Sequence, residues 1–114
     1  MHRDLKAENV VFSKSSFKDG FDNLELKVID FGFANIDNKN EMKEYLGTPH
    51  YMAPEILLKK PYGAAVDIWA LGVLTYLIID GDFPFNASTK KEMHEAIING
   101  ELVFKNEAAW SEVS

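Results

Sequence analysis

HRDLKAEN, at residues 2–9, gathers an acid, a lysine and an amide directly before a short apolar run. That run, Val10–Phe12, has the composition of a short strand and ends at a polar loop. Further along, Leu24–Val28 alternates apolar and charged residues, and this period of two predicts a half-buried strand. We therefore expect a small antiparallel hairpin that carries Asn9 at one side and Asp30 at the other.

The size and charge of the chain narrow the classes of function. With 114 residues and 46% hydrophobic content, the chain has the size of one modest globular domain. Its formal net charge of −6 argues against nucleic acid or an anionic membrane surface as the main partner. It contains no cysteine, which excludes disulfides and cysteine-based zinc sites and is typical of a reducing compartment.

The second half of the sequence predicts helices. Its longest apolar segment, Ile68–Ile79, runs to about 12 residues, a length more typical of a core helix than of a bilayer span. The predicted core helix runs from about Ala64 to Ile79 and ends at Asp80-Gly81-Asp82. Because the segment is apolar nearly all round, we expect protein to enclose this helix on every side. The other predicted elements are an irregular loop over 33–47, a short helix from Pro54 to about Leu58, a helix capped by Ser88 or Thr89 and ended by Gly100, and a last helix entered from 101–114.

Two further motifs follow HRDLKAEN in the chain: DFG at 30–32 and APE at 53–55. Taken alone, the DLK of the first motif could be a solvated helix face, and DFG could be a tight turn before a loop. All three in this order, with the hairpin between them and the apolar helix after them, resemble the catalytic half of a protein kinase. Because the resemblance covers essentially all of the chain, residues 1–114 are interpreted as one partial protein kinase domain.

The resemblance implies an α+β fold that is mainly α, a partial protein-kinase-like fold corresponding to the C-lobe. Its parts would be the catalytic-loop hairpin, the activation segment and the buried central helix. The N-lobe, with its glycine-rich loop and strand lysine, and the last helices would lie outside this chain. Little would then fix ATP, so we expect the isolated chain to be inactive although its family is enzymatic.

The reaction of this family is phosphoryl transfer, which needs a group that orients the attacking hydroxyl, magnesium ligands, and positive charge near the phosphoryl group. By resemblance, Asp4 is the catalytic base and Lys6 directs its ammonium at the γ-phosphate. Asn9 and Asp30 would hold Mg²⁺, a cation that prefers oxygen ligands. By the same resemblance, Glu8 belongs to the nucleotide-binding residues and would also contact a basic residue that lies upstream of the acceptor in the substrate.

Lys6 and the stretch GTPHYMAPE at 47–55 resemble the serine/threonine branch of the family, so the expected acceptor is a Ser or Thr hydroxyl. Thr48 would hydrogen-bond both catalytic side chains and shape the pocket beside the acceptor. Arg3 would pair with Glu44, a permanent carboxylate where many relatives carry a phosphorylated residue. The alternative for Glu44 is a solvated charge among its charged neighbours.

Five residues resemble structural positions of the family. His2 and Phe31 would stack in an internal hydrophobic column, and Gly32 would permit the backbone turn that aims the aspartate of DFG inward. Asp67 would accept backbone N–H bonds from the catalytic loop, which satisfies a buried carboxylate. Glu55 would form a buried ion pair with an arginine beyond this chain, and without that partner its burial destabilises the fold.

Within this branch, DFGFA at 30–34, the acid at position 44 and DIWALGV at 67–73 resemble the calcium/calmodulin-regulated group, most closely the calcium-dependent protein kinases. The implied cofactors are ATP and Mg²⁺. The implied partners are a protein substrate and a calcium sensor or calmodulin-like regulator, with no nucleic acid and no membrane span, in the cytoplasm. Ala7, where proline is commoner, is a mild departure. Leu77 stands where some basophilic relatives have a second acid, so the substrate preference is open.

The alternative function is a non-catalytic kinase-like binding module, which would contact the substrates or regulators of a kinase. Such a role would not require Asp4, Asn9 and Asp30 together. Their joint presence favours the enzymatic interpretation.

Overall fold

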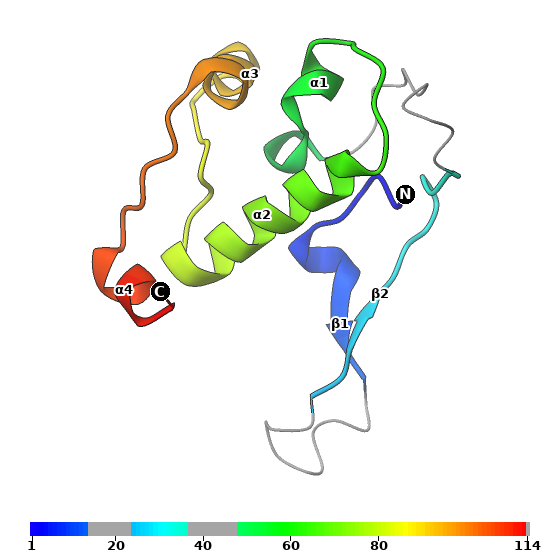
Figure 1. Cartoon of the computed structure of the whole chain (residues 1–114), viewed down its shortest axis with the longest axis horizontal. Coiled ribbons are helices and arrows are strands. Elements are labelled where there is room, and N and C mark those ends of the chain that lie inside the picture. The colour runs from blue at the N-terminus through cyan, green and yellow to red at the C-terminus, as the bar shows by residue number, and fades with distance from the viewer. Residues whose placement is uncertain (14–23, 37–47, 114) are drawn as a thin grey trace.

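Over the residues that it describes, 1–13, 24–36 and 48–113, the computed structural model contains a two-stranded ribbon and four α-helices, of which α2 is the longest and lies at the centre (Figure 1). In chain order the elements are η1 Ala7–Asn9, β1 Val10–Phe12, β2 Leu26–Val28, η3 Pro49–Tyr51, α1 Pro54–Leu57, α2 Ala65–Asp80, α3 Lys90–Asn99 and α4 Glu107–Val113. The ribbon lies toward the start of α2, and α4 lies toward its end (Figure 1). This is the mainly helical α+β class that the sequence predicts.

The hairpin expected from the sequence is confirmed. β1 and β2 pair antiparallel, with Val10 opposite Val28 and Phe12 opposite Leu26. The predicted half-burial of the second strand is wrong, since every residue of β2 is exposed and Leu26 is 59% exposed. A two-stranded ribbon has two open faces, and no segment within the described ranges covers β2 on either of them.

The long helix is also confirmed, but not its predicted enclosure. α2 ends at Gly81, which has a φ of +88° and the left-handed conformation common after a helix. The buried residues of α2 are Val66, Ala70, Val73, Leu74 and Tyr76. Ile68, Leu71 and Ile78 on the remaining surface are 49–73% exposed. Within the described residues, protein therefore encloses one face of α2 and leaves the other bare.

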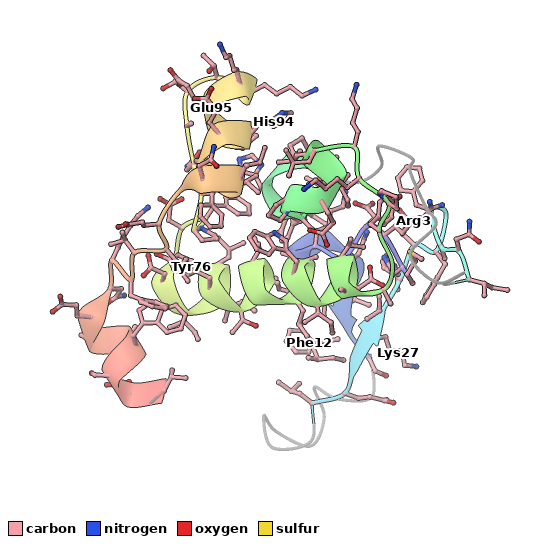
Figure 2. All side chains as sticks on the ribbon, turned by 45° about the horizontal axis from the view of Figure 1, so that its top comes forward. Arg3, Phe12, Lys27, Tyr76, His94 and Glu95 are labelled. Atoms are coloured by element: carbon pink, nitrogen blue, oxygen red, sulfur yellow. The ribbon has the colours of Figure 1, made fainter. Side chains whose placement is uncertain are left out.

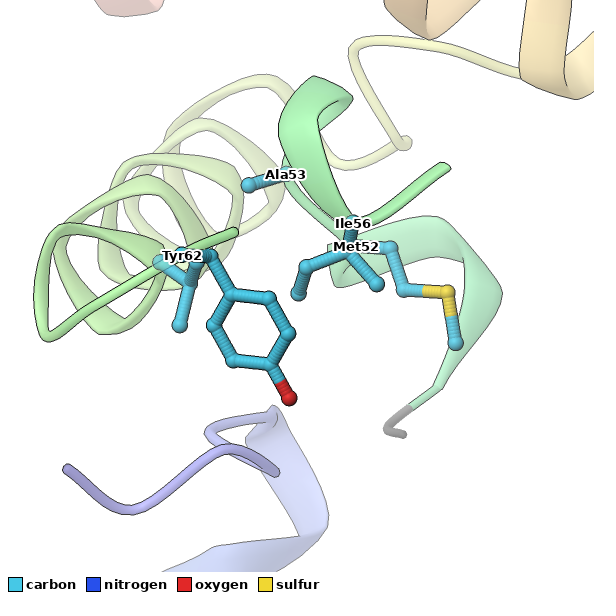
Figure 3. Packing of buried hydrophobic residues seen from close by; sticks show 5 residues of the cluster. Met52, Ala53, Ile56 and Tyr62 are labelled. Carbon is cyan, nitrogen blue, oxygen red and sulfur yellow. The ribbon is translucent and has the colours of Figure 1, made fainter. Parts of the chain in front are cut away.

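The core at the start of α2 is assembled by the segment that contains APE (Figure 3). Its members are Met52, Ala53, Ile56, Tyr62 and Val66, all 5% exposed or less. The predicted short helix is present as α1, which begins at Pro54, where proline costs nothing because the first N–H of a helix has no intrahelical partner.

A second core cluster joins the middle of α2 to η3 and to the N-terminal segment. Its buried members are Tyr51, Ala70, Val73 and Leu74. Leu5, Val10 and Phe83 pack against them from three separate parts of the chain. The same apolar contacts that stabilise α2 thus also fix the segment that carries HRDLKAEN.

The two C-terminal helices follow their predicted signals. Thr89 caps α3, because its Oγ1 accepts a hydrogen bond from the Glu92 N–H at 3.2 Å. Gly100 directly follows the last residue of α3, as predicted. α4 confirms the last predicted helix. No helix in the described part of the chain is long and apolar enough to cross a membrane.

Asp80, the last residue of α2, holds the start of α4. Its Oδ1 accepts hydrogen bonds from Lys105 N at 3.1 Å, Asn106 N at 2.9 Å and Trp110 Nε1 at 2.9 Å. Desolvation raises the pKa of Asp80, but these hydrogen bonds together lower it more, so its pKa lies below the ordinary value. The ionised carboxylate is therefore the form that connects the two helices.

Candidate active site

Asp67, in the first turn of α2, holds the HRD loop, here residues 2–6. Its Oδ2 accepts a hydrogen bond from His2 N–H at 2.7 Å, and its Oδ1 accepts one from Arg3 N–H at 2.9 Å. Arg3 has a φ of +69°, which is uncommon for a residue with a side chain. The paired bonds help to hold this conformation. Figure 2 shows Arg3 at this end of α2 and Tyr76 at the opposite end.

Asp4, Lys6 and Thr48 form one connected polar group. The Thr48 hydroxyl donates to Asp4 Oδ1 at 3.1 Å, and Lys6 Nζ donates to the same hydroxyl at 3.1 Å. Lys6 Nζ also lies 3.5 Å from Asp4 Oδ2. Asp4 is buried whereas Lys6 is 24% exposed, so the acid is held by the protein and the ammonium borders solvent.

Asn9 is buried and its amide is directed at Asp4. Its Nδ2 donates to the Asp4 carbonyl oxygen at 2.8 Å and lies 3.4 Å from Asp4 Oδ2. The Asn9 carbonyl accepts a hydrogen bond from Ile29 N–H at 2.9 Å, one residue before Asp30. The hairpin therefore brings the backbone beside Asn9 next to the residue that precedes DFG.

Asp30 and Gly32 differ from the expected arrangement. Asp30, not Gly32, has the left-handed backbone, with a φ of +61°. The Asp30 Oδ1 accepts the Gly32 N–H at 3.3 Å, and a Cβ added at Gly32 would lie 3.1 Å from that oxygen. The left-handed residue of this turn is thus Asp30 and not Gly32, and the glycine leaves room for the Asp30 carboxylate.

His2 connects the HRD loop with DFG. Its Nε2 donates to the Ile29 carbonyl at 2.9 Å, and its Nδ1 accepts the Asp4 N–H at 3.2 Å. The ring meets Phe31 edge-on, with ring centroids 4.8 Å apart. Phe31 is 63% exposed, so one end of this aromatic pair is open to solvent.

The side chain of Arg3 reaches the segment after DFG. Its Nε donates to the Phe33 carbonyl oxygen, and its Nη1 donates to the Tyr62 hydroxyl at 3.4 Å. Glu44 lies outside the described residues, so its pairing with Arg3 stays a prediction. Arg3 thus connects the residue that follows DFG with the turn that follows α1.

Two predicted acids lie apart from the polar group around Asp4. Glu8 is exposed in η1, consistent with a role at the surface of the site. Glu55, in the first turn of α1, is only partly buried and pairs with no cation in the described ranges. Its predicted burial is therefore incomplete here.

Tyr51 and Tyr62 belong to the site, although no sequence motif singles out their hydroxyl groups. The Tyr51 hydroxyl accepts the Ala7 N–H at 3.3 Å, and the Tyr62 hydroxyl accepts from Arg3. The available signal is indirect: a buried tyrosine, unlike phenylalanine, needs a polar partner for its hydroxyl. Such a signal says that a partner exists but does not identify it.

The whole chain, residues 1–114, matches the family described as "Protein kinase domain". The chain therefore belongs to the protein kinase family.

Several relatives carry serine/threonine kinase names. The chain is 40% identical to serine/threonine-protein kinase H1 homolog of Danio rerio, over 99% of this chain and 26% of the relative. It is 43% identical to serine/threonine-protein kinase 33 of Bos taurus, over 100% of this chain and 24% of the relative. It is 42% identical to calcium-dependent protein kinase 16 of Oryza sativa subsp. japonica, over 100% of this chain and 20% of the relative. The chain thus spans about a quarter of the length of these relatives.

Proposed function

We propose that this chain is part of a serine/threonine protein kinase, which transfers the γ-phosphoryl group of Mg-ATP to a Ser or Thr hydroxyl of a protein. Membership of the kinase family and the names of the relatives support this. The observation that carries the proposal is the Thr48 hydroxyl, which contacts both Asp4 and Lys6. A base and a cation held at one point are what transfer to a hydroxyl requires.

Asp4 orients the acceptor hydroxyl and accepts its proton. Thr48 donates to Oδ1 of Asp4, and Lys6 lies beside Oδ2, so the carboxylate is fixed in direction. Since the transition state of this reaction is loose, fixing the direction of attack is most of the task. The Lys6 ammonium stabilises the negative charge of the phosphoryl group.

Asn9 and Asp30 fit a magnesium ion by the chemistry of their donors. Asn9 uses Nδ2 to hold the Asp4 carbonyl, which leaves the amide oxygen for a cation. Asp30 is exposed and uses Oδ1 for the Gly32 N–H, which leaves Oδ2. Mg²⁺ takes oxygen ligands and one or two carboxylates from a protein, which suits this pair better than a cluster of acids. When bound, the ion would offset the charge of the ATP phosphates.

We expect the isolated chain to bind Mg-ATP weakly and to transfer phosphate at background level. Its polar group holds the acceptor side of the reaction, and the relatives are three to five times longer than the part matched here. Positioning supplies most of the rate in this class of reaction, so the acceptor side alone gives little of it. Calorimetry measures this directly, and a micromolar dissociation constant for the chain alone would contradict it.

Transfer of radiolabelled phosphate to a serine peptide with an upstream arginine tests the function. The chain is assayed alone and fused to the N-terminal and C-terminal kinase segments of a relative. We expect activity from the fusion, and a loss of roughly a thousandfold with Asp4→Asn. The matched control is Glu95→Gln, an exposed acid on α3, which should retain activity. A folded but inactive fusion, or one indifferent to Asp4→Asn, refutes the proposal.

The proposal also covers the regulator of the complete protein and its location in the cell. Relatives named for calcium or calcium/calmodulin dependence support a calcium-sensing partner for the complete protein. Glu8 is exposed and would face a basic residue of the substrate. From its family and composition, we propose that the protein is cytoplasmic.

A non-catalytic binding module is the second candidate, and the bare face of α2 favours it. Ile68, Leu71 and Ile78 present an apolar surface, of the kind that marks contact sites. The fusion assay separates the candidates, because a binding module would leave the fusion without phosphotransfer.

A further inference from the structure

The side chain of Tyr51, the last residue of η3, reaches the start of η1. The side chain is 6% exposed and packs against Ala70, Val73 and Leu74 of α2. Its ring meets that of Phe83 at right angles, with centroids 5.4 Å apart. Because these apolar side chains hold the ring, the hydroxyl at its end has a defined position.

The Tyr51 hydroxyl accepts a hydrogen bond from the Ala7 N–H, which has no acceptor within η1. Ala7 is the first residue of η1, and the first N–H groups of a helix have no partner within it. The preceding residue, Lys6, makes no side-chain cap and its ammonium has no acceptor atom. The Tyr51 oxygen, 3.3 Å from the Ala7 nitrogen, takes this place.

We propose that Tyr51 is a positioning residue whose hydroxyl holds η1 and thereby sets the placement of Lys6 and Asn9. These two residues flank the bonded Ala7, Lys6 directly before it and Asn9 at the end of the same turn. The catalytic consequence rests on the proposed kinase function, whereas the structural one does not.

The protonation state of Tyr51 suits this role. Burial raises the pKa of its phenol, Glu8 raises it further, and the Ala7 N–H and Lys6 lower it less. The group is therefore a neutral hydroxyl at physiological pH. A neutral hydroxyl accepts the amide hydrogen bond and adds no negative charge beneath Lys6 and Asp4.

The bond can be removed from either end with small changes in shape. Tyr51→Phe deletes the acceptor and keeps the ring. Ala7→Pro deletes the donor, and proline fits the first position of a helical turn. Tyr62→Phe is the matched control, since it also removes a buried tyrosine hydroxyl, one whose bond goes to Arg3.

Amide hydrogen exchange of the 114-residue chain tests the positioning. We expect Tyr51→Phe to speed exchange at Ala7 and Asn9 by about tenfold, the contribution of one partly buried hydrogen bond. Tyr62→Phe should leave these two amides unchanged, and the amides of α2 should stay protected in both variants. Unchanged exchange at Ala7 in a folded Tyr51→Phe variant overturns the proposal.

Steady-state kinetics of the fused kinase test the consequence. We expect Tyr51→Phe to lower kcat about tenfold in the parent, and by less than about twofold when Ala7→Pro is already present. A role of the ring alone predicts no loss in either background, and a role of the hydroxyl outside this bond predicts the same loss in both. Either result overturns the catalytic part. If the parent fusion transfers no phosphate, the proposed function fails while exchange still decides on the hydrogen bond.

Discussion

The two faces of α2 share an apolar composition but have opposite surroundings. On one face, Val73 and Leu74 are at most 7% exposed beneath Tyr51 and the HRD loop. On the other, Ile68 and Leu71 are 70% and 49% exposed. Apolar residues two to six positions apart along one helix thus differ widely in burial, so the sequence of a helix alone does not reveal which of its faces is covered.

The covered face also carries the polar anchors of the site. Asp67, in the first turn of α2, accepts two N–H groups of the HRD loop, and Tyr51 links the same face to η1. The bare face instead borders an apolar groove of about 590 Å³, lined in part by Ile68, Phe85 and Phe104. Substitutions on the first face should therefore cost stability and activity, and substitutions on the second should cost neither.

The largest difference is expected between two leucine truncations. Leu74→Ala creates a cavity in the covered face and should lower the free energy of unfolding by about 3 kcal/mol. Leu71→Ala removes a side chain that is already half exposed and should cost less than about 1 kcal/mol. Urea unfolding followed by circular dichroism measures both. Equal losses would mean that the bare face is covered in solution.

Asp67→Asn should have the next largest effect. The substitution keeps one acceptor oxygen but places an NH₂ group against a backbone N–H of the HRD loop, so one bond is lost. We expect a loss of about 2 kcal/mol in the same unfolding experiment. Glu95→Gln, an exposed acid on α3, is the control and should change stability by less than about 0.5 kcal/mol.

The contact between α2 and α4 should depend on pH. Because the pKa of Asp80 is lowered in the fold, the contact is complete above the ordinary value of 3.8 and is lost as the pH falls through the folded pKa. Trp110 donates to this carboxylate, so its fluorescence should change as the pH falls below 3.8, the ordinary pKa of an aspartate. The Asp80→Asn variant should show a smaller change over this range. An identical profile in both proteins would assign the transition to another group.

The smallest effect on stability is expected from Ile68→Gln. This side chain is 70% exposed, so the free energy of unfolding should change by no more than about 0.5 kcal/mol. Self-association should nevertheless fall, because the change interrupts an exposed apolar surface. Light scattering at increasing protein concentration measures this. Unchanged scattering would show that the bare face does not drive association.

The sequence predicts the elements well because their signals are local. The period of two around Leu26, the threonine at position 89 and the glycines after α2 and α3 each act within a few residues. The motifs likewise predict that Asp4, Lys6 and Thr48 meet, since the resemblance fixes their partners. Burial is different, because it depends on segments far away in the chain.

Three features could not be read from the sequence for that reason. The exposure of β2 and of one side of α2 depends on what else packs there. The turn at DFG uses a positive φ at Asp30, where a glycine two residues later appeared the natural choice. The bond from Ala7 to Tyr51 joins two residues 44 positions apart, and neither has a polar pattern around it that points to the other.

The left-handed backbone at Arg3 has a consequence for how this position can vary. Glycine would relieve the main chain there but would forfeit the guanidinium that reaches Phe33 and Tyr62. A β-branched residue would lose the same contacts and add crowding of its own. Main-chain conformation thus favours glycine at this position, whereas the contacts to Phe33 and Tyr62 require arginine. Randomising the position should return few stable variants, with glycine and asparagine the best tolerated among the residues that lack a cation.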